Sequence, residues 1–196
     1  MANSTEQHQK PPPLNFKYDS NVAKFAVSQK AYLATHSDGT FDHIATGSLV
    51  LVTTATSAPR ILLLQRAASD SHPNKWEPPG GACDDEDETI LYGAARELWE
   101  EAGLVATFIS GPVGEPNFFT TRNGRNVCRF HFAVGVDSYA GVLPAVQLDP
   151  NEHQSFVWAS EDEVKARKVG GVELEFTRDN VEQTVHQAFV DFHARK

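Results

Sequence analysis

Three glutamates have the residue type and the spacing that could do chemistry most directly. Glu97, Glu100 and Glu101 lie within a segment that reads as a helix, at spacings of three and four residues. Such spacings place side chains on one helix face, where like charges repel each other. A hard divalent cation would relieve the repulsion, since Mg²⁺ takes oxygen ligands and keeps positions for water and phosphates. The sequence therefore predicts a metal centre here.

A helix over residues 87–102 would position these carboxylates. Gly103 follows it, and glycine suits the left-handed residue that ends many helices. The apolar positions at helical spacing form a separate stripe for the core: Leu91, Ala95, Leu98 and Ala102. Before the helix, Gly80 and Gly81 follow two prolines, so the backbone could approach a ligand and offer carbonyl oxygens.

The alternative interpretation of the same residues is an exposed acidic helix without an ion. Such a face normally includes lysines that relieve the repulsion, and here only Arg96 is near. A calcium loop of the EF-hand type is excluded, because the acidic run lacks the glycine required at its sixth position.

Strands and helices are mixed along the rest of the chain. Nearly continuous apolar runs over residues 44–53 and 60–65 predict strands covered on both faces. Residues 126–136 alternate between apolar and polar, which predicts a half-buried strand, and a short strand is expected at 155–158. A capping box at Ser160–Glu163 and an apolar stripe from Val181 to Phe192 predict two more helices. The pattern indicates an α/β sandwich around a mixed sheet.

Composition limits the class of protein. The net charge of −9 argues against extended nucleic acid as a partner, because an acidic surface repels polyanions. Two cysteines are too few for a disulfide framework, and no stretch is long enough to span a membrane, so we expect a cytoplasmic protein. Residues 1–20 are polar and contain three consecutive prolines, which predicts a flexible arm before a single domain at 21–196.

The residues from Arg96 to Leu104 resemble a known family. Their sequence RELWEEAGL matches the core REUxEExGU of the Nudix hydrolases, in which U is an aliphatic residue. Glu88 stands eight residues before Arg96, as the leading glutamate of the family does, and residues 76–81 (WEPPGG) resemble the usual approach. The family leaves five residues between its glycine and that glutamate, whereas six separate Gly81 from Glu88. We interpret the difference as one inserted residue in the loop at 83–87.

The resemblance implies a Nudix-type α/β/α sandwich and metal-dependent cleavage of a diphosphate bond. The substrate would be a nucleoside diphosphate-linked or related small molecule. Glu97, Glu100 and Glu101, with a carbonyl of Gly81, would hold Mg²⁺ or Mn²⁺. Arg96 and Glu88 would form an ion pair that orients the carboxylates.

Other candidates have two open interpretations each. Glu152, in a later loop, could be a further metal ligand or a general base, or a solvated side chain. Arg66 could bind a phosphate or simply end its strand, and Arg129 faces either a cleft or water. Phe119 could stack on a base or pack in the core. His153 is interpreted as a surface residue.

Two alternatives to a hydrolase stay open at this point. One is a Nudix-like module that binds a nucleotide without cleaving it, although such a module should have lost its carboxylates. The other is an enzyme that uses the metal as a Lewis acid on a different substrate. The sequence does not select a particular diphosphate compound, and a homodimer stays open.

Overall fold

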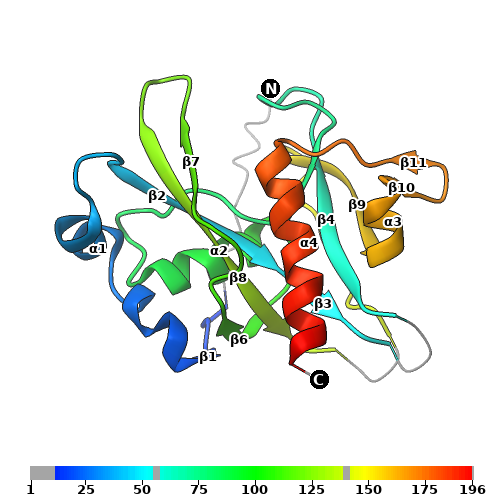
Figure 1. Ribbon diagram of the computed structural model, residues 1–196, viewed down its shortest axis with the longest axis horizontal. Helices are drawn as coiled ribbons and strands as arrows, with labels where there is room; N and C mark the ends of the chain where they lie inside the picture. Colours follow the sequence, from blue (N-terminus) through cyan, green and yellow to red (C-terminus); the bar gives the residue numbers. More distant parts are fainter. Residues whose placement is uncertain (1–11, 55–57, 139–141, 196) are drawn as a thin grey trace, which may run out of the picture.

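The computed structural model describes residues 12–54, 58–138 and 142–195 (Figure 1). Its helices are η1 (Ser20–Phe25, a 3-10 helix), α1 (Gln29–His36), α2 (Ile90–Ala102), α3 (Glu161–Lys165) and α4 (Asp179–Ala194). Its strands are β1 (Lys17–Tyr18), β2 (His43–Leu49), β3 (Leu51–Val52), β4 (Arg60–Arg66), β5 (Trp76–Glu77), β6 (Ala106–Ser110), β7 (Asn117–Thr120), β8 (Asn126–Val136), β9 (His153–Ser160), β10 (Lys168–Val169) and β11 (Val172–Glu173).

The strands form two main sheets. In the first sheet the order is β1-β6-β8-β2, and β7 also pairs with β8. The pairs β1–β6 and β2–β8 are parallel and the others antiparallel, so this sheet is mixed as predicted. In the second sheet β4 pairs with β3, β5 and β9, all antiparallel. The predicted strand over 44–53 is therefore two strands, because the chain passes from the first sheet to the second at Val50.

Helices α2 and α4 pack with two different clusters of apolar side chains. The cluster under α2 takes alternate residues of β8: Cys128, Phe130, Phe132 and Val134. Between them Arg129 and His131 point to the other face, where Ala133 joins the cluster under α4. The period of two in this strand thus separates a purely apolar layer from a face that carries polar groups.

The ends of α2 follow from its flanking residues. Thr89 caps the N-terminus, with its hydroxyl accepting a hydrogen bond from Tyr92 N–H at 3.0 Å, so α2 starts three residues later than predicted. Gly103 follows the C-terminus in the left-handed region (φ 67°), as predicted. The capping box predicted at Ser160 and Glu163 is present at the start of α3.

Helix α4 buries the predicted apolar stripe, including Val181, Val185 and Phe189. Among the residues that the structure describes, no helix is long and apolar enough to cross a membrane.

The segment before α1 differs from the prediction of a flexible arm through residue 20. Lys17 and Tyr18 form β1 alongside Phe108 and Ile109 of β6, and Leu14 and Phe16 pack against the core. Leu14 and Phe16, two positions apart in an otherwise polar segment, attach this part of the chain to the domain. The prediction is wrong for residues 12–20, and residues 1–11 lie outside the described part of the chain.

Candidate metal and substrate site

The segment from Pro79 to Cys83 runs beside β2 and brings its glycines to α2. Thr46 N–H donates to Gly81 O at 2.8 Å, and Ser48 N–H donates to Pro79 O at 2.8 Å. A carbonyl oxygen has two lone pairs, so the Gly81 carbonyl that was predicted to face a metal already uses one of them.

Both glycines allow contacts that a side chain would block. At Gly80, whose φ is 149°, a Cβ atom would collide with the backbone of Thr46. At Gly81 it would lie 2.6 Å from a carboxylate oxygen of Glu97. The backbone therefore lies directly against the carboxylate-bearing face of α2, as the Gly-Gly approach predicted.

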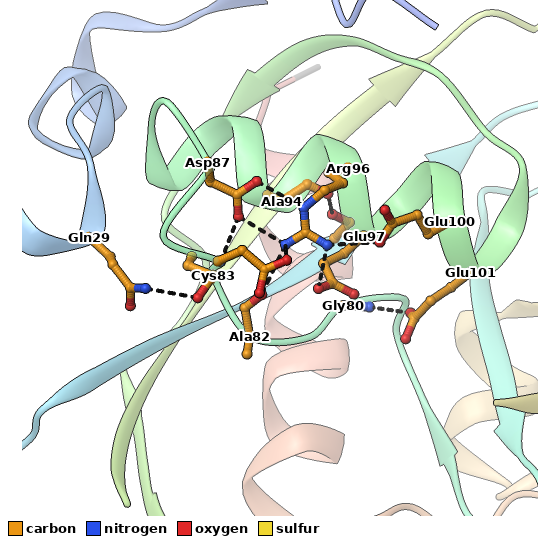
Figure 2. Close-up of polar contacts among 12 residues, drawn as sticks. Gln29, Gly80, Ala82, Cys83, Asp87, Ala94, Arg96, Glu97, Glu100 and Glu101 are labelled. Carbon is orange, nitrogen blue, oxygen red and sulfur yellow. Dashed lines mark hydrogen bonds and ion pairs between the residues drawn. The ribbon is translucent and has the colours of Figure 1, made fainter. Parts of the chain in front are cut away.

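Arg96 holds two of the three helix carboxylates in place (Figure 2). Its Nη1 lies 2.9 Å from Glu97 Oε1 and 2.8 Å from Glu100 Oε2. On the other side, its Nε and Nη2 donate to the two carboxylate oxygens of Asp87 at 2.8 and 2.9 Å. The guanidinium thus offsets the repulsion that the sequence predicted for the helix face.

Asp87 and not the predicted Glu88 pairs with Arg96. Asp87 is buried, pairs with Arg96 and accepts a hydrogen bond from Asp84 N–H at 2.8 Å, whereas Glu88 is exposed. Counted forward from Gly81, Asp87 leaves the five intervening residues that the family pattern requires; counted back from Arg96, Glu88 fits. Because the loop has one extra residue, no single side chain can have both the family's spacing from the glycine and its spacing from the arginine. The turn before Thr89 directs Asp87 towards Arg96.

Glu101 is separate from this cluster. Its side chain points away from Arg96 to Gly80, whose N–H donates to Glu101 Oε2 at 2.6 Å (Figure 2). Burial, and then the nearby charge of Glu97, raise the pKa of Glu101 well above its ordinary value. Burial also raises the pKa of Glu97 to about 7, although Arg96 opposes the shift. Carboxylates in such surroundings fit a bound cation, which would favour their charged forms.

Glu152 and His153 lie beside Glu101 at the start of β9. One possible ligand atom from each of the three residues falls within a group whose members are all within 4.8 Å of one another. Glu152 is exposed, while His153 is only 1% exposed, so its interpretation as a surface residue is wrong. Burial lowers the pKa of His153, and neither ring nitrogen has a hydrogen-bond partner among the described residues. A buried neutral imidazole between two carboxylates fits a metal ligand set.

Glu77, 3% exposed, joins two of the predicted substrate-binding arginines to this site. One of its oxygens pairs with Arg66, and the other lies 3.4 Å from Arg129 Nη1 and accepts a hydrogen bond from the Thr177 hydroxyl at 3.3 Å. Arg66 also pairs with Asp70. Burial opposes the ionisation of Glu77, but the charges of Arg129 and Arg66 outweigh it and hold its pKa below the ordinary value. Glu77 is therefore a carboxylate anchor for both arginines.

Phe119 lies against two guanidinium groups and outside the apolar clusters. The guanidinium carbon of Arg129 is 5.5 Å from its ring centroid, and that of Arg178 is 4.6 Å away. Arg178, which immediately precedes α4, is exposed and was not identified from the sequence. The residues next to Arg178 in the sequence do not indicate a binding role, because Arg178 reaches Phe119 only through the packing of α4 on the sheet.

A family model described as the NUDIX domain matches residues 43–179 of the chain, which include every one of these side chains. The chain belongs to the Nudix family.

Curated relatives of this Nudix chain carry the name m7GpppN-mRNA hydrolase NUDT17. The human protein is 32% identical over 124 residues, which make up 58% of this chain and 38% of that protein. The bovine protein is 45% identical over 56 residues, 28% of this chain and 18% of that protein. The chain thus spans well under half the length of the curated relatives that it matches.

Solved structures show the same Nudix fold. A MutT protein from Methanosarcina mazei aligns with a TM-score of 0.54 and 25% identity, covering 79% of this chain and 96% of that one. The NUDIX domain of Shewanella oneidensis NrtR, solved with ADP ribose, aligns with a TM-score of 0.59 and 20% identity over 85% of this chain and 99% of that domain. The predicted α/β/α sandwich is confirmed.

His131, two residues from Arg129 on β8 of this Nudix domain, should make the fold sensitive to acid. Burial, and then the charge of Arg129, lower its pKa to about 3. Below pH 6.5 the unfolded chain binds a proton that the folded chain does not, so stability falls as the pH falls from 6.5 towards 3. Between pH 7.5 and pH 5 we expect His131→Gln to lose about 2 kcal/mol less than the unmodified protein in urea unfolding. The same substitution at His43 is the control, and equal losses in both variants would contradict the assignment.

Proposed function

We propose that this Nudix hydrolase cleaves a phosphoanhydride bond in a nucleoside diphosphate-linked or related small molecule, with Mg²⁺ or Mn²⁺ as cofactor. The observation that carries the proposal is the buried carboxyl of Glu101 beside Glu152 and His153. A buried carboxyl group is costly to ionise when no cation is near it. A divalent cation bound by these three side chains would offset that cost.

The side chains around this group have complementary roles in the proposal. Glu101, Glu97 and Glu100 would hold the metal, joined by Glu152, by His153 and by a carbonyl of the Gly80–Gly81 turn. When bound, the cation would neutralise charge on the substrate and lower the pKa of an attacking water. Asp87 and Arg96 would fix Glu97 and Glu100 without touching substrate, because their bonds run between the loop and the helix. Glu152, the exposed member, is the candidate to move a proton.

Arg66, Arg129 and Phe119 would bind the substrate. The two arginines anchored by Glu77 are preorganised cations next to the metal ligands, and phosphoanhydride cleavage depends mainly on positioning and charge neutralisation. The net charge of −9 supports a small molecule over an extended nucleic acid as the partner. Two buried free cysteines support a reducing compartment such as the cytoplasm.

The names of the relatives supply the candidates for the substrate. They point to the m7GpppN end of mRNA, to ADP ribose and to Ap4A, the last from a Caenorhabditis elegans hydrolase that aligns with a TM-score of 0.58 and 22% identity over 79% of this chain and 100% of that one. We propose that this chain acts on one compound of this kind.

A release assay tests the proposal. The purified chain is incubated with ADP-ribose, Ap4A, a capped dinucleotide and nucleoside triphosphates, each with Mg²⁺, with Mn²⁺ and with excess EDTA. We expect phosphate or nucleotide release from at least one compound, and its loss in EDTA. Equal release with and without EDTA would contradict the metal dependence. Binding of the compounds without release of any product would instead identify a non-catalytic module.

A further inference from the structure

One face of the first sheet carries hydrogen-bond donors and positive charge that the metal ligands do not use. Arg129 of β8 stands directly opposite Asn117 of β7, so both side chains share the face on which Phe119 also lies. Helix α4 begins beside this face, because the Arg178 guanidinium lies over the Phe119 ring. The groups therefore come from two strands and one helix terminus and meet at Phe119.

Two buried donors on this face lack a partner among the described residues. They are Nδ2 of Asn117 and Nε of Arg129. Asn117 is only 7% exposed, so its amide is more than nine-tenths buried. Leaving such a group unpaired is unfavourable, and a ligand with acceptor oxygens would remove that penalty. Because both of these atoms donate, they are complementary to a ligand with acceptor oxygens, and the positive charge of Arg129 favours an anionic one.

This face carries a cation that has no carboxylate partner. Arg66 pairs with Asp70 and Glu77, and Arg129 also pairs with Glu77, whereas Arg178 forms no ion pair with any residue in the described ranges. The first turn of α4 has no side-chain cap, and its N–H groups add partial positive charge, which Asp179 and Glu182 offset in part. The pKa of His72 is lowered, first by burial and then by the positive charges of Arg178 and Arg66. The negative charges of Glu77 and Asp70 oppose this shift.

The location separates this face from the bond to be cleaved. Glu77 neighbours Glu101 on one side and contacts Arg129 at 3.4 Å on the other. Phe119 lies beyond Arg129, and Arg178 lies against Phe119. An anionic group held by Arg178 is therefore several side chains away from the metal ligands.

We propose that Asn117, Arg129 and Arg178 form a subsite for a phosphate that lies beyond the scissile diphosphate. Phe119 acts as a positioning residue that holds both guanidinium groups through its ring. The substrate class is then a nucleoside or dinucleoside polyphosphate with at least three phosphates, in preference to a diphosphate-linked sugar. The inference rests on the proposed function and narrows its substrate.

Kinetics on compounds with the same base test the subsite. Arg178→Gln is compared with the unmodified chain on ADP-ribose, diadenosine triphosphate and Ap4A. We expect KM for the two polyphosphates to rise about tenfold with kcat unchanged, equivalent to about 1.4 kcal/mol, and KM for ADP-ribose to change less than twofold. Lys24→Gln is the control, because Lys24 is also an exposed cation over an aromatic ring, 5.0 Å from the centroid of Phe25, on η1.

A second variant tests the role of the buried amide group of Asn117. Asn117→Asp keeps the size of the side chain but replaces a donor with a carboxylate, and it should raise KM for the polyphosphates at least as much as Arg178→Gln. Thermal melting confirms that each variant is folded. An equal effect of Arg178→Gln on all substrates, or a preference of the unmodified chain for ADP-ribose, would overturn the subsite.

A binding measurement separates this inference from the proposed function. If no compound is cleaved, the hydrolase proposal fails, and calorimetry with inorganic tripolyphosphate in EDTA then tests the subsite alone. Weaker binding by Arg178→Gln than by Lys24→Gln supports the anion subsite. Equal binding by both variants, or none by the unmodified chain, overturns it.

Discussion

Replacing Glu101 with glutamine should lower kcat/KM at least a hundredfold, which corresponds to about 2.7 kcal/mol of lost transition-state stabilisation. Glutamine keeps the volume of the side chain and one carbonyl oxygen that can accept the hydrogen bond from Gly80 N–H, 2.6 Å away. It removes the negative charge that we assign to the metal. The measurement is steady-state hydrolysis of the best compound from the release assay, at saturating Mg²⁺ or Mn²⁺.

The fold should survive this substitution. An amide is cheaper to bury than a carboxyl group whose pKa is raised by burial, so we expect the metal-free variant to melt at or above the temperature of the unmodified chain. Glu88→Gln is the matched control, since Glu88 is exposed and should lose no activity. Retained turnover in a folded Glu101→Gln variant would remove Glu101 from the metal site.

Asp87→Asn should destabilise the protein by roughly 3 kcal/mol, because it breaks a buried ion pair from one side. The Asp87 side chain is 3% exposed and that of Arg96 is 12% exposed, and they share two hydrogen bonds of 2.8 and 2.9 Å. The measurement is the free energy of unfolding in urea. Glu88→Gln, one residue along the chain, should change it by less than about 0.5 kcal/mol.

We therefore expect a large loss of stability when Asp87 is replaced and almost none when the adjacent Glu88 is replaced. Activity should also fall in Asp87→Asn, because Arg96 would lose its ion pair with the loop and would hold Glu97 and Glu100, at 2.9 and 2.8 Å, less firmly. If Glu88→Gln proved the more destabilising of the two, the assignment of Asp87 as the orienting acid would be refuted.

The sequence predicts best where one periodic pattern decides the structure. The alternation from Asn126 to Val136 gives β8 with the same bounds, since apolar side chains on one face of a strand fix both its extent and its register. The stripe beginning at Leu91 and the glycine at 103 similarly locate α2. The same periodicity places Glu97, Glu100 and Glu101 at neighbouring positions of α2, but it does not predict that Glu101 turns to Gly80 while the other two pair with Arg96.

Residues that meet only through tertiary packing could not be predicted in this way. Asp87 and Glu88 differ by one position in a loop, and no local pattern says which one turns inward. His153 is a metal-ligand candidate only because β9 places it beside Glu101, and Arg178 reaches Phe119 from a different part of the chain. Residues 14–18 lacked a long apolar pattern, since two strand residues pairing with a sheet edge leave almost no periodic signal.

We expect the strand β1 to limit self-association through the edge of the first sheet. In the described part of the chain, β6 pairs with β8 on one side and with Lys17 and Tyr18 on the other. Without those two residues, β6 would present unpaired backbone groups and the exposed ring of Phe108 to solvent. An open edge of this kind can pair with the edge of another sheet. A chain that began after Asp19 would therefore retain all the candidate ligands and yet be prone to aggregate, so any shortening of the N-terminus should stop before Leu14.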